Sequence, residues 1–71
     1  MRRKATASEA LVSIGYDARR QILEVEFDGG DVYRYRDVPV EVYETLLAAE
    51  SKGTWFNQTF KRLGFEYEQV D

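Results

Sequence analysis

Residues 22–36 read ILEVEFDGGDVYRYR, and this stretch decides the fold class. Apolar residues alternate with Glu24 and Glu26, which is the period of a strand with one buried face. The segment Asp28-Gly29-Gly30-Asp31 then forms a strong turn signal, because glycine tolerates positive φ. Val32–Arg36 alternates again. The stretch therefore predicts an antiparallel β-hairpin.

Charge selects the register that we expect for this hairpin. With Phe27 opposite Tyr33, one face of both strands is wholly apolar or aromatic. The other face then carries pairs of opposite charge, which are Glu26 with Arg34 and Glu24 with Arg36. A slip of one residue would mix apolar and charged side chains on both faces, so we expect this register.

A further strand is expected before the hairpin. Residues 1–10 show no strong period, and we expect them to form a flexible N-terminal tail. From Leu11 onward, Val12, Ile14 and Tyr16 alternate with small residues, which predicts a strand. The same face argument pairs Ile14 with Leu23 and Val12 with Val25.

Two short helices are expected after the hairpin. The first begins near Pro39 and ends at Gly53, and its apolar stripe consists of Val42, Tyr43, Leu46 and Leu47. The second is capped by Thr54 and ends at Gly64, with a stripe made of Phe56, Phe60 and Leu63. Residues 65–70 alternate and suggest an edge strand.

The predicted fold is α+β, with a three-stranded antiparallel β-meander covered on one face by two short α-helices and a C-terminal edge strand. The length of 71 residues allows one domain, which we place at residues 11–71.

Composition excludes several classes of protein. The chain has no cysteine and no histidine, which removes disulfide scaffolds, thiolate metal sites and the commonest general base. It lacks a glycine-rich phosphate loop with lysine and a nucleophile elbow. We therefore expect no enzymatic activity, no cofactor, no metal and no membrane insertion, and a cytoplasmic location.

Ordered motifs resemble one known family, the KTSC domain. They are Ile14-Gly15-Tyr16-Asp17, Leu23-x-Val25-x-Phe27, Tyr33-Arg34-Tyr35, Val38-Pro39, Ser51-Lys52-Gly53 and Phe56-Asn57. The family is named after a segment at the C-terminus of some lysyl-tRNA synthetases and also occurs as a stand-alone bacterial protein. The resemblance implies a small α+β module of unknown activity, with a suggested association with RNA, and no catalytic residues to carry over.

Candidate binding residues follow from charge and aromaticity. They are Arg19, Arg20, Arg34, Arg36, Trp55, Lys61 and Arg62. Arg34 and Arg36 suit phosphates, but pairing with Glu26 and Glu24 is the favoured interpretation. Trp55 is either an exposed contact residue or a packing residue.

The family-motif residues are expected to be structural. Tyr33 and Tyr35 suit base stacking, but the register favours a place in the core. Phe56 belongs to the second helical stripe, and Asn57 is expected to cap or tie the helix junction.

We expect a non-catalytic binding module that associates with RNA, in particular tRNA, as a monomer or weak homodimer. The net charge of −3 opposes this function, because nucleic-acid binders gain affinity from a basic field. The alternative is a protein-interaction or inhibitor module that docks through Trp55 and an exposed sheet edge.

Overall fold

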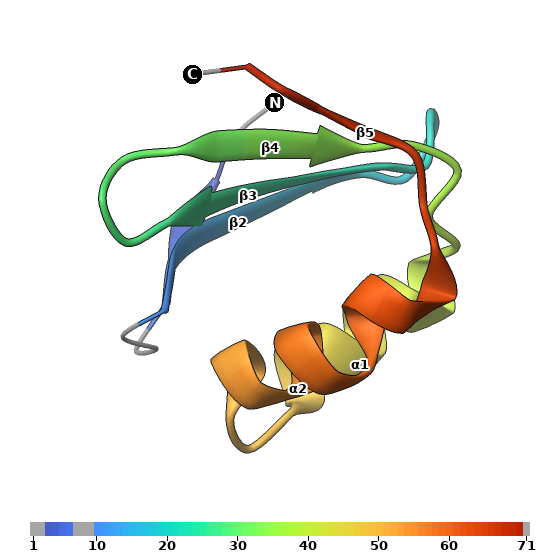
Figure 1. Ribbon diagram of the computed structural model, residues 1–71. Coiled ribbons are helices and arrows are strands. Elements are labelled where there is room, and N and C mark those ends of the chain that lie inside the picture. The colour runs from blue at the N-terminus through green and yellow to red at the C-terminus, as the bar shows by residue number, and fades with distance from the viewer. Residues whose placement is uncertain (1–2, 7–9, 71) are drawn as a thin grey trace.

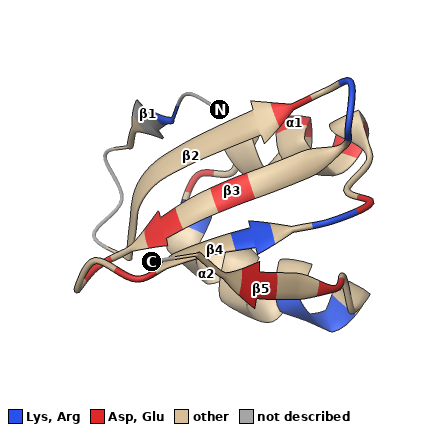
Figure 2. Cartoon of the chain, turned by 90° about the horizontal axis from the view of Figure 1, so that it is seen from above, with Lys and Arg blue, Asp and Glu red and all other residues tan. Residues whose placement is uncertain are grey.

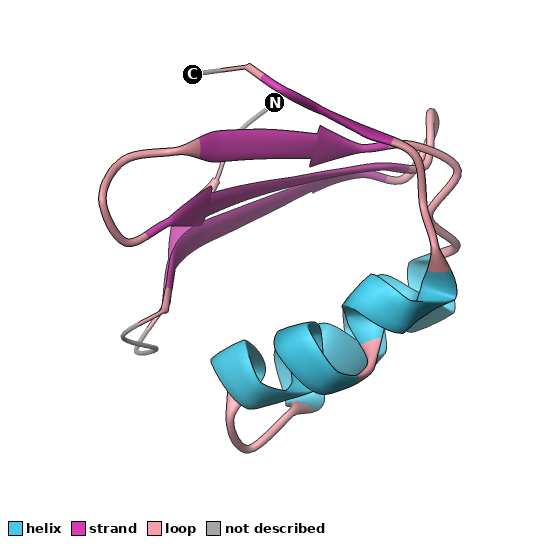
Figure 3. Cartoon of the chain, in the orientation of Figure 1, coloured by secondary structure: helices cyan, strands magenta, loops and turns pink. Residues whose placement is uncertain are grey.

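The computed structural model describes residues 3–6 and 10–70, and these form a sheet with helices on one face (Figures 1 and 3). The sheet has five antiparallel strands in the order β1-β2-β3-β4-β5. The elements are β1 (Lys4–Ala5), β2 (Leu11–Asp17), β3 (Ile22–Phe27), β4 (Val32–Tyr35), α1 (Val40–Ala48), α2 (Lys52–Gln58), the 3₁₀ helix η1 (Phe60–Leu63) and β5 (Tyr67–Gln69). The predicted meander, helical pair and C-terminal edge strand are confirmed, and β1 adds a strand at the opposite edge.

Part of the expected N-terminal tail is a strand. The register of β1 on β2 joins Lys4 with Ile14 and Ala5 with Ser13. The prediction of a tail over residues 1–10 is therefore wrong for residues 4–5, because backbone pairing of two residues leaves no side-chain period to read. Residues 1–2 and 7–9 of that tail lie outside the described residues.

The β3–β4 hairpin has the predicted faces but a different register. Its observed pairs are Val25 with Tyr33 and Glu24 with Arg34. The turn closes around residues 28–30, since the Phe27 N–H donates to the Asp31 carbonyl at 2.8 Å. A shift of two residues keeps every side chain on its face, so the face argument did not separate the two registers.

The β2–β3 hairpin is shifted in the same way and contains a β-bulge. Its observed pairs are Ile14 with Val25 and Tyr16 with Leu23. The bulge lies between Leu11 and Ser13. It leaves Leu11 only 1% exposed and Val12 38% exposed, so the expected place of Val12 on the core face is wrong.

The helices differ from prediction at their junction. Ser51, not Thr54, caps α2, because the Ser51 Oγ accepts the Thr54 N–H at 3.4 Å. Gly53 is buried inside α2 and does not end the first helix. The 3₁₀ helix η1 replaces the expected last turn of the second helix, and Gly64 ends it with a φ of 74°.

The core lies between the sheet and the helices. Phe56 and Phe60 stack with ring centroids 4.5 Å apart, and Tyr35 packs edge-on against both. Leu47 and Leu63, which were expected in the apolar stripes, are 43% and 50% exposed. The buried core residues are Leu11, Ile14, Leu23, Val25, Tyr35, Val38, Leu46, Phe56 and Phe60. No helix in the described ranges has the length and apolarity that a bilayer crossing requires.

Candidate functional site

An aromatic groove lies between the β4–β5 edge of the sheet and η1. Tyr33 and Tyr35 come from β4, and Tyr67 of β5 is paired with Tyr35. The groove has a volume of about 380 Å³ and is lined by Tyr33, Tyr35, Phe60, Lys61, Phe65 and Tyr67. Two parts of the chain that are distant in sequence, residues 33–35 and 60–67, therefore build one site.

The rings of the groove form a closed floor and an open rim. Tyr35 is 6% exposed, whereas Tyr67 is 59% exposed. The Tyr67 ring centroid lies 5.2 Å from that of Tyr35 and 5.6 Å from that of Tyr33. Phe65 closes the inner end against Phe60, with 5.2 Å between their centroids. An exposed ring over a rigid aromatic floor suits stacking on a flat unsaturated group.

The charge of the groove lining is positive. Lys61 is a cation, and the other five lining residues are aromatic, so the lining contains no carboxylate. Burial raises the pKa of Tyr35 to about 12, with smaller contributions from Tyr67 and Tyr33. The Tyr35 hydroxyl is therefore neutral at physiological pH and adds no negative charge to the groove.

The basic residues that were predicted to bind lie in separate places. Arg19 and Arg20 occupy the β2–β3 turn, where the Asp17 Oδ1 accepts their backbone N–H groups at 3.1 and 3.2 Å. Arg36 directly follows β4 and therefore lies at the same end of the sheet, where the loops carry both basic and acidic residues (Figure 2). Its N–H donates to the Glu66 carbonyl at 2.9 Å. Arg36 therefore lies beside the segment that joins η1 to β5.

Two further cations belong to η1. Lys61 and Arg62 are both exposed there, and Lys61 lines the groove. Trp55 is half-buried in α2, with its ring centroid 6.3 Å from that of Phe60. Asn57 is exposed in α2, whose caps are Ser51 and Thr59.

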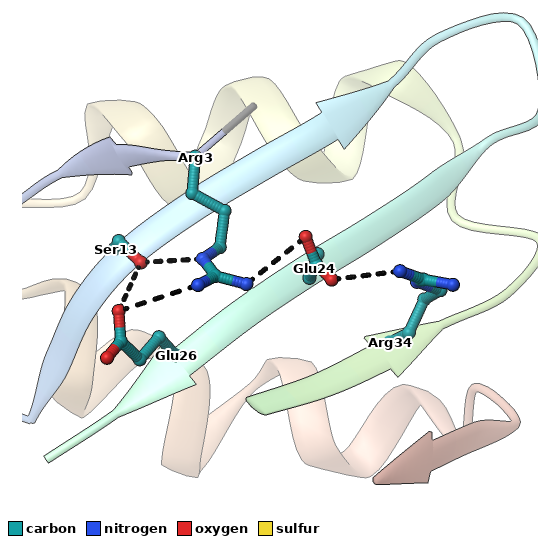
Figure 4. Close-up of polar contacts among 5 residues, drawn as sticks. All are labelled: Arg3, Ser13, Glu24, Glu26 and Arg34. Carbon is teal, nitrogen blue, oxygen red and sulfur yellow. Dashed lines mark hydrogen bonds and ion pairs between the residues drawn. The ribbon is translucent and has the colours of Figure 1, made fainter. Parts of the chain in front are cut away.

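Arg34 lies in a polar network on the face of the sheet that points away from the helices (Figure 4). Glu24 is 5% exposed, and its Oε1 lies 3.1 Å from the Arg34 Nη2. The Glu24 Oε2 lies 3.3 Å from the Arg3 Nη1. The Arg3 Nε donates to the Ser13 Oγ at 2.9 Å, and Ser13 donates to the Glu26 Oε1 at 2.8 Å. Arg34 is thus paired with a glutamate, but the expected pairing with Glu26 is wrong.

Both edges of the expected three-stranded meander are covered in the described chain. β1 pairs with β2, and β5 pairs with β4. Among the described strands, the open edges are therefore the outer sides of β1 and β5 and the part of β2 that β1 does not reach. Within residues 3–6 and 10–70, no group of three or more His, Cys, Asp or Glu residues is placed to hold a metal ion.

Comparison with known proteins identifies the family. The model of the KTSC domain matches residues 7–65, which is most of the chain. The chain belongs to the KTSC domain family. The resemblance that the ordered motifs suggested is thereby confirmed.

Relatives of this KTSC domain include small proteins and parts of larger ones. An uncharacterized protein of Stutzerimonas stutzeri is 51% identical over 71 residues, which is 100% of both chains. The lysine–tRNA ligase of Trichormus variabilis is 46% identical over 55 residues, which is 78% of this chain and 10% of the ligase. The crystal structure of a KTSC domain protein from Yersinia pestis has a TM-score of 0.89 at 31% identity, covering 99% of this chain and 97% of that chain.

Some residues of these sites were not predicted. Phe65 and Tyr67 join the groove because Gly64 turns the chain back along β4. The alternation of residues 65–70 indicated a strand, but it did not indicate beside which element this strand would lie. The contacts of Arg3 could not be predicted, because they cross from the N-terminal segment to β2 and β3.

Proposed function

We propose that this KTSC domain is a non-catalytic module that binds single-stranded RNA, with one base stacked in the aromatic groove. The observation that carries the proposal is the groove lining, which combines the Tyr33, Tyr35 and Tyr67 rings with the single cation Lys61. Unpaired bases stack on aromatic side chains of a sheet, and a neighbouring lysine contacts phosphate. The lysine–tRNA ligase relatives support the proposal, since their name describes proteins that act on tRNA.

The charge distribution determines the kind of binding that we expect. The net charge of −3 gives no broad basic field, so stacking has to supply most of the affinity. Lys61 is the nearest phosphate contact, and Arg36 lies beside the η1–β5 segment. Each phosphate contact to a single strand adds about 0.7 to the slope of log affinity against log salt. We therefore expect a shallow salt dependence.

Arg19 and Arg20 lie in the turn between β2 and β3, and we assign them a secondary phosphate contact outside the groove. Arg34 is left out of the proposed interface, because the buried Glu24 pairs with it on the other face. Protein docking through Trp55 is less favoured, because that ring packs against the core.

Fluorescence anisotropy with a labelled single-stranded RNA of mixed sequence tests the proposal. Tyr67→Ala removes an exposed ring and Lys61→Ala removes the lining cation. Loss of one stacked base costs about 1–3 kcal/mol, so we expect Tyr67→Ala to weaken binding by about 5- to 150-fold. Lys52→Ala, in the first turn of α2 and outside the groove lining, is the matched control.

The proposal is overturned if the native chain does not bind at low salt. It is also overturned if Tyr67→Ala and Lys61→Ala bind as tightly as Lys52→Ala. A duplex RNA without unpaired bases should bind more weakly than the single strand, because its bases are not free to stack.

A further inference from the structure

The polar face of the sheet holds a guanidinium group from the N-terminus. The Arg3 side chain lies in a shallow hollow of about 590 Å³, where Ser13, Glu24 and Glu26 surround its nitrogens (Figure 4). The Nε donates to the Ser13 Oγ at 2.9 Å. Nη1 lies 3.3 Å from the Glu24 Oε2, and Nη2 lies 3.8 Å from the Glu26 Oε1. All three guanidinium nitrogens thus have an oxygen partner.

The walls of this hollow are held by contacts that do not involve Arg3. Glu24 is fixed by Arg34 on β4, and Glu26 is fixed by the Ser13 hydroxyl on β2. Glu24 and Glu26 are two residues apart on β3 and share a face. The Glu24 Oε2, which contacts Arg3 and not Arg34, therefore faces the hollow beside the Glu26 carboxylate. Such an arrangement favours a planar cation whose N–H donors point in fixed directions. The guanidinium group of arginine has this geometry, and the ammonium group of lysine does not.

The N-terminal segment that carries Arg3 is short, and besides β1 the Thr6 N–H donates to the Val12 carbonyl at 3.0 Å. β1 has only two residues, which pair with Ile14 and Ser13 of the seven-residue strand β2. The KTSC match covers residues 7–65, so Ser13, Glu24 and Glu26 lie inside the matched range, whereas Arg3 and Ala5 lie before it. Most of the hollow is therefore built by residues of the matched range, whereas its present occupant comes from the segment before that range.

We propose that the hollow is a recognition site for an arginine side chain, and that an arginine-bearing extended segment of a partner protein occupies it by replacing β1 along β2. Addition of a strand to a sheet edge supplies backbone hydrogen bonds, and the hollow supplies side-chain specificity. Val12, which the bulge turns toward the same face, lines the hollow and offers an apolar contact to the partner segment. Arg3 acts as an internal competitor for this site. The proposal is independent of RNA binding in the aromatic groove.

A peptide titration of the full-length isotope-labelled Arg3→Ala chain tests the proposal. The probe is a blocked hexapeptide with the sequence of residues 1–6, MRRKAT, and the control is the same peptide with Arg3→Lys. We expect saturable amide shifts at Ser13, Glu24 and Glu26. If β1 is docked about nine-tenths of the time, the probe should bind the native chain about tenfold more weakly than the Arg3→Ala chain.

A second variant separates specific binding from loss of structure. Glu26→Gln, added to Arg3→Ala, removes a partly exposed carboxylate and should abolish the difference between the arginine and lysine peptides. The proposal fails if the Arg3→Ala chain shows no saturable shifts or binds both peptides equally. It also fails if unlabelled native chain produces the same shifts together with a dimer mass, because the occupant is then a second copy. RNA is absent from all these samples, so failure here leaves the groove proposal untouched.

Discussion

Glu24 and Arg34 face each other across β3 and β4, with 3.1 Å between Oε1 and Nη2, although Glu24 is only 5% exposed. Arg3 contacts the other carboxylate oxygen. We expect Glu24→Gln to lower the free energy of unfolding by about 1–3 kcal/mol, because two guanidinium groups lose their charged acceptor. Urea unfolding measures the loss, with Glu44→Gln on the exposed side of α1 as control. Equal stability of the two variants would contradict this account of the network.

Leu46 and Leu47 are neighbours in α1 that differ completely in burial. Leu46 is 0% exposed and Leu47 is 43% exposed. Leu46→Ala should lower the free energy of unfolding by about 2–5 kcal/mol, because it leaves a cavity in the core. Leu47→Ala should change it by less than about 0.5 kcal/mol. Similar urea midpoints for both variants would show that α1 packs differently on the sheet.

The hydroxyl of Tyr35 should make stability depend on alkaline pH. Burial raises its pKa from 10.0 to about 12. The folded value lies above the unfolded value, so this contribution to stability is complete below about pH 10 and is lost as pH rises toward about 12. Tyrosinate absorbance against pH should show a late step whose amplitude Tyr35→Phe reduces, while Tyr16, whose pKa burial also raises, still contributes to it. An unchanged titration in Tyr35→Phe would contradict the buried position.

The faces of the strands could be predicted from the sequence, but their registers could not. Val25 and Tyr33 are on the core side as expected, yet they are paired with each other instead of with residues two positions away. Side-chain alternation has a period of two, so it cannot distinguish two strand registers that differ by two residues. The tight turn between Phe27 and Asp31 decides the register, and its closure depends on backbone geometry.

The candidate site was only partly visible in the sequence. Tyr33 and Tyr35 could be identified from the hairpin, and Lys61 from the charge of the second helical segment. Their meeting with Tyr67 depends on the left-handed Gly64, which returns the chain to β4. The role of Arg3 depends on pairing between β1 and β2, for which two residues give no periodic signal.

The most direct test of the central claim is a chemical-shift titration of the isotope-labelled native chain with short single-stranded RNA, at low and moderate salt. We predict that the shifted amides cluster at Tyr33, Lys61, Phe65 and Tyr67, around the groove. The shifts should persist, somewhat reduced, at moderate salt, because stacking carries most of the affinity. A spectrum that does not change at low salt, or shifts confined to the Arg19–Arg20 turn, would contradict base stacking in the aromatic groove.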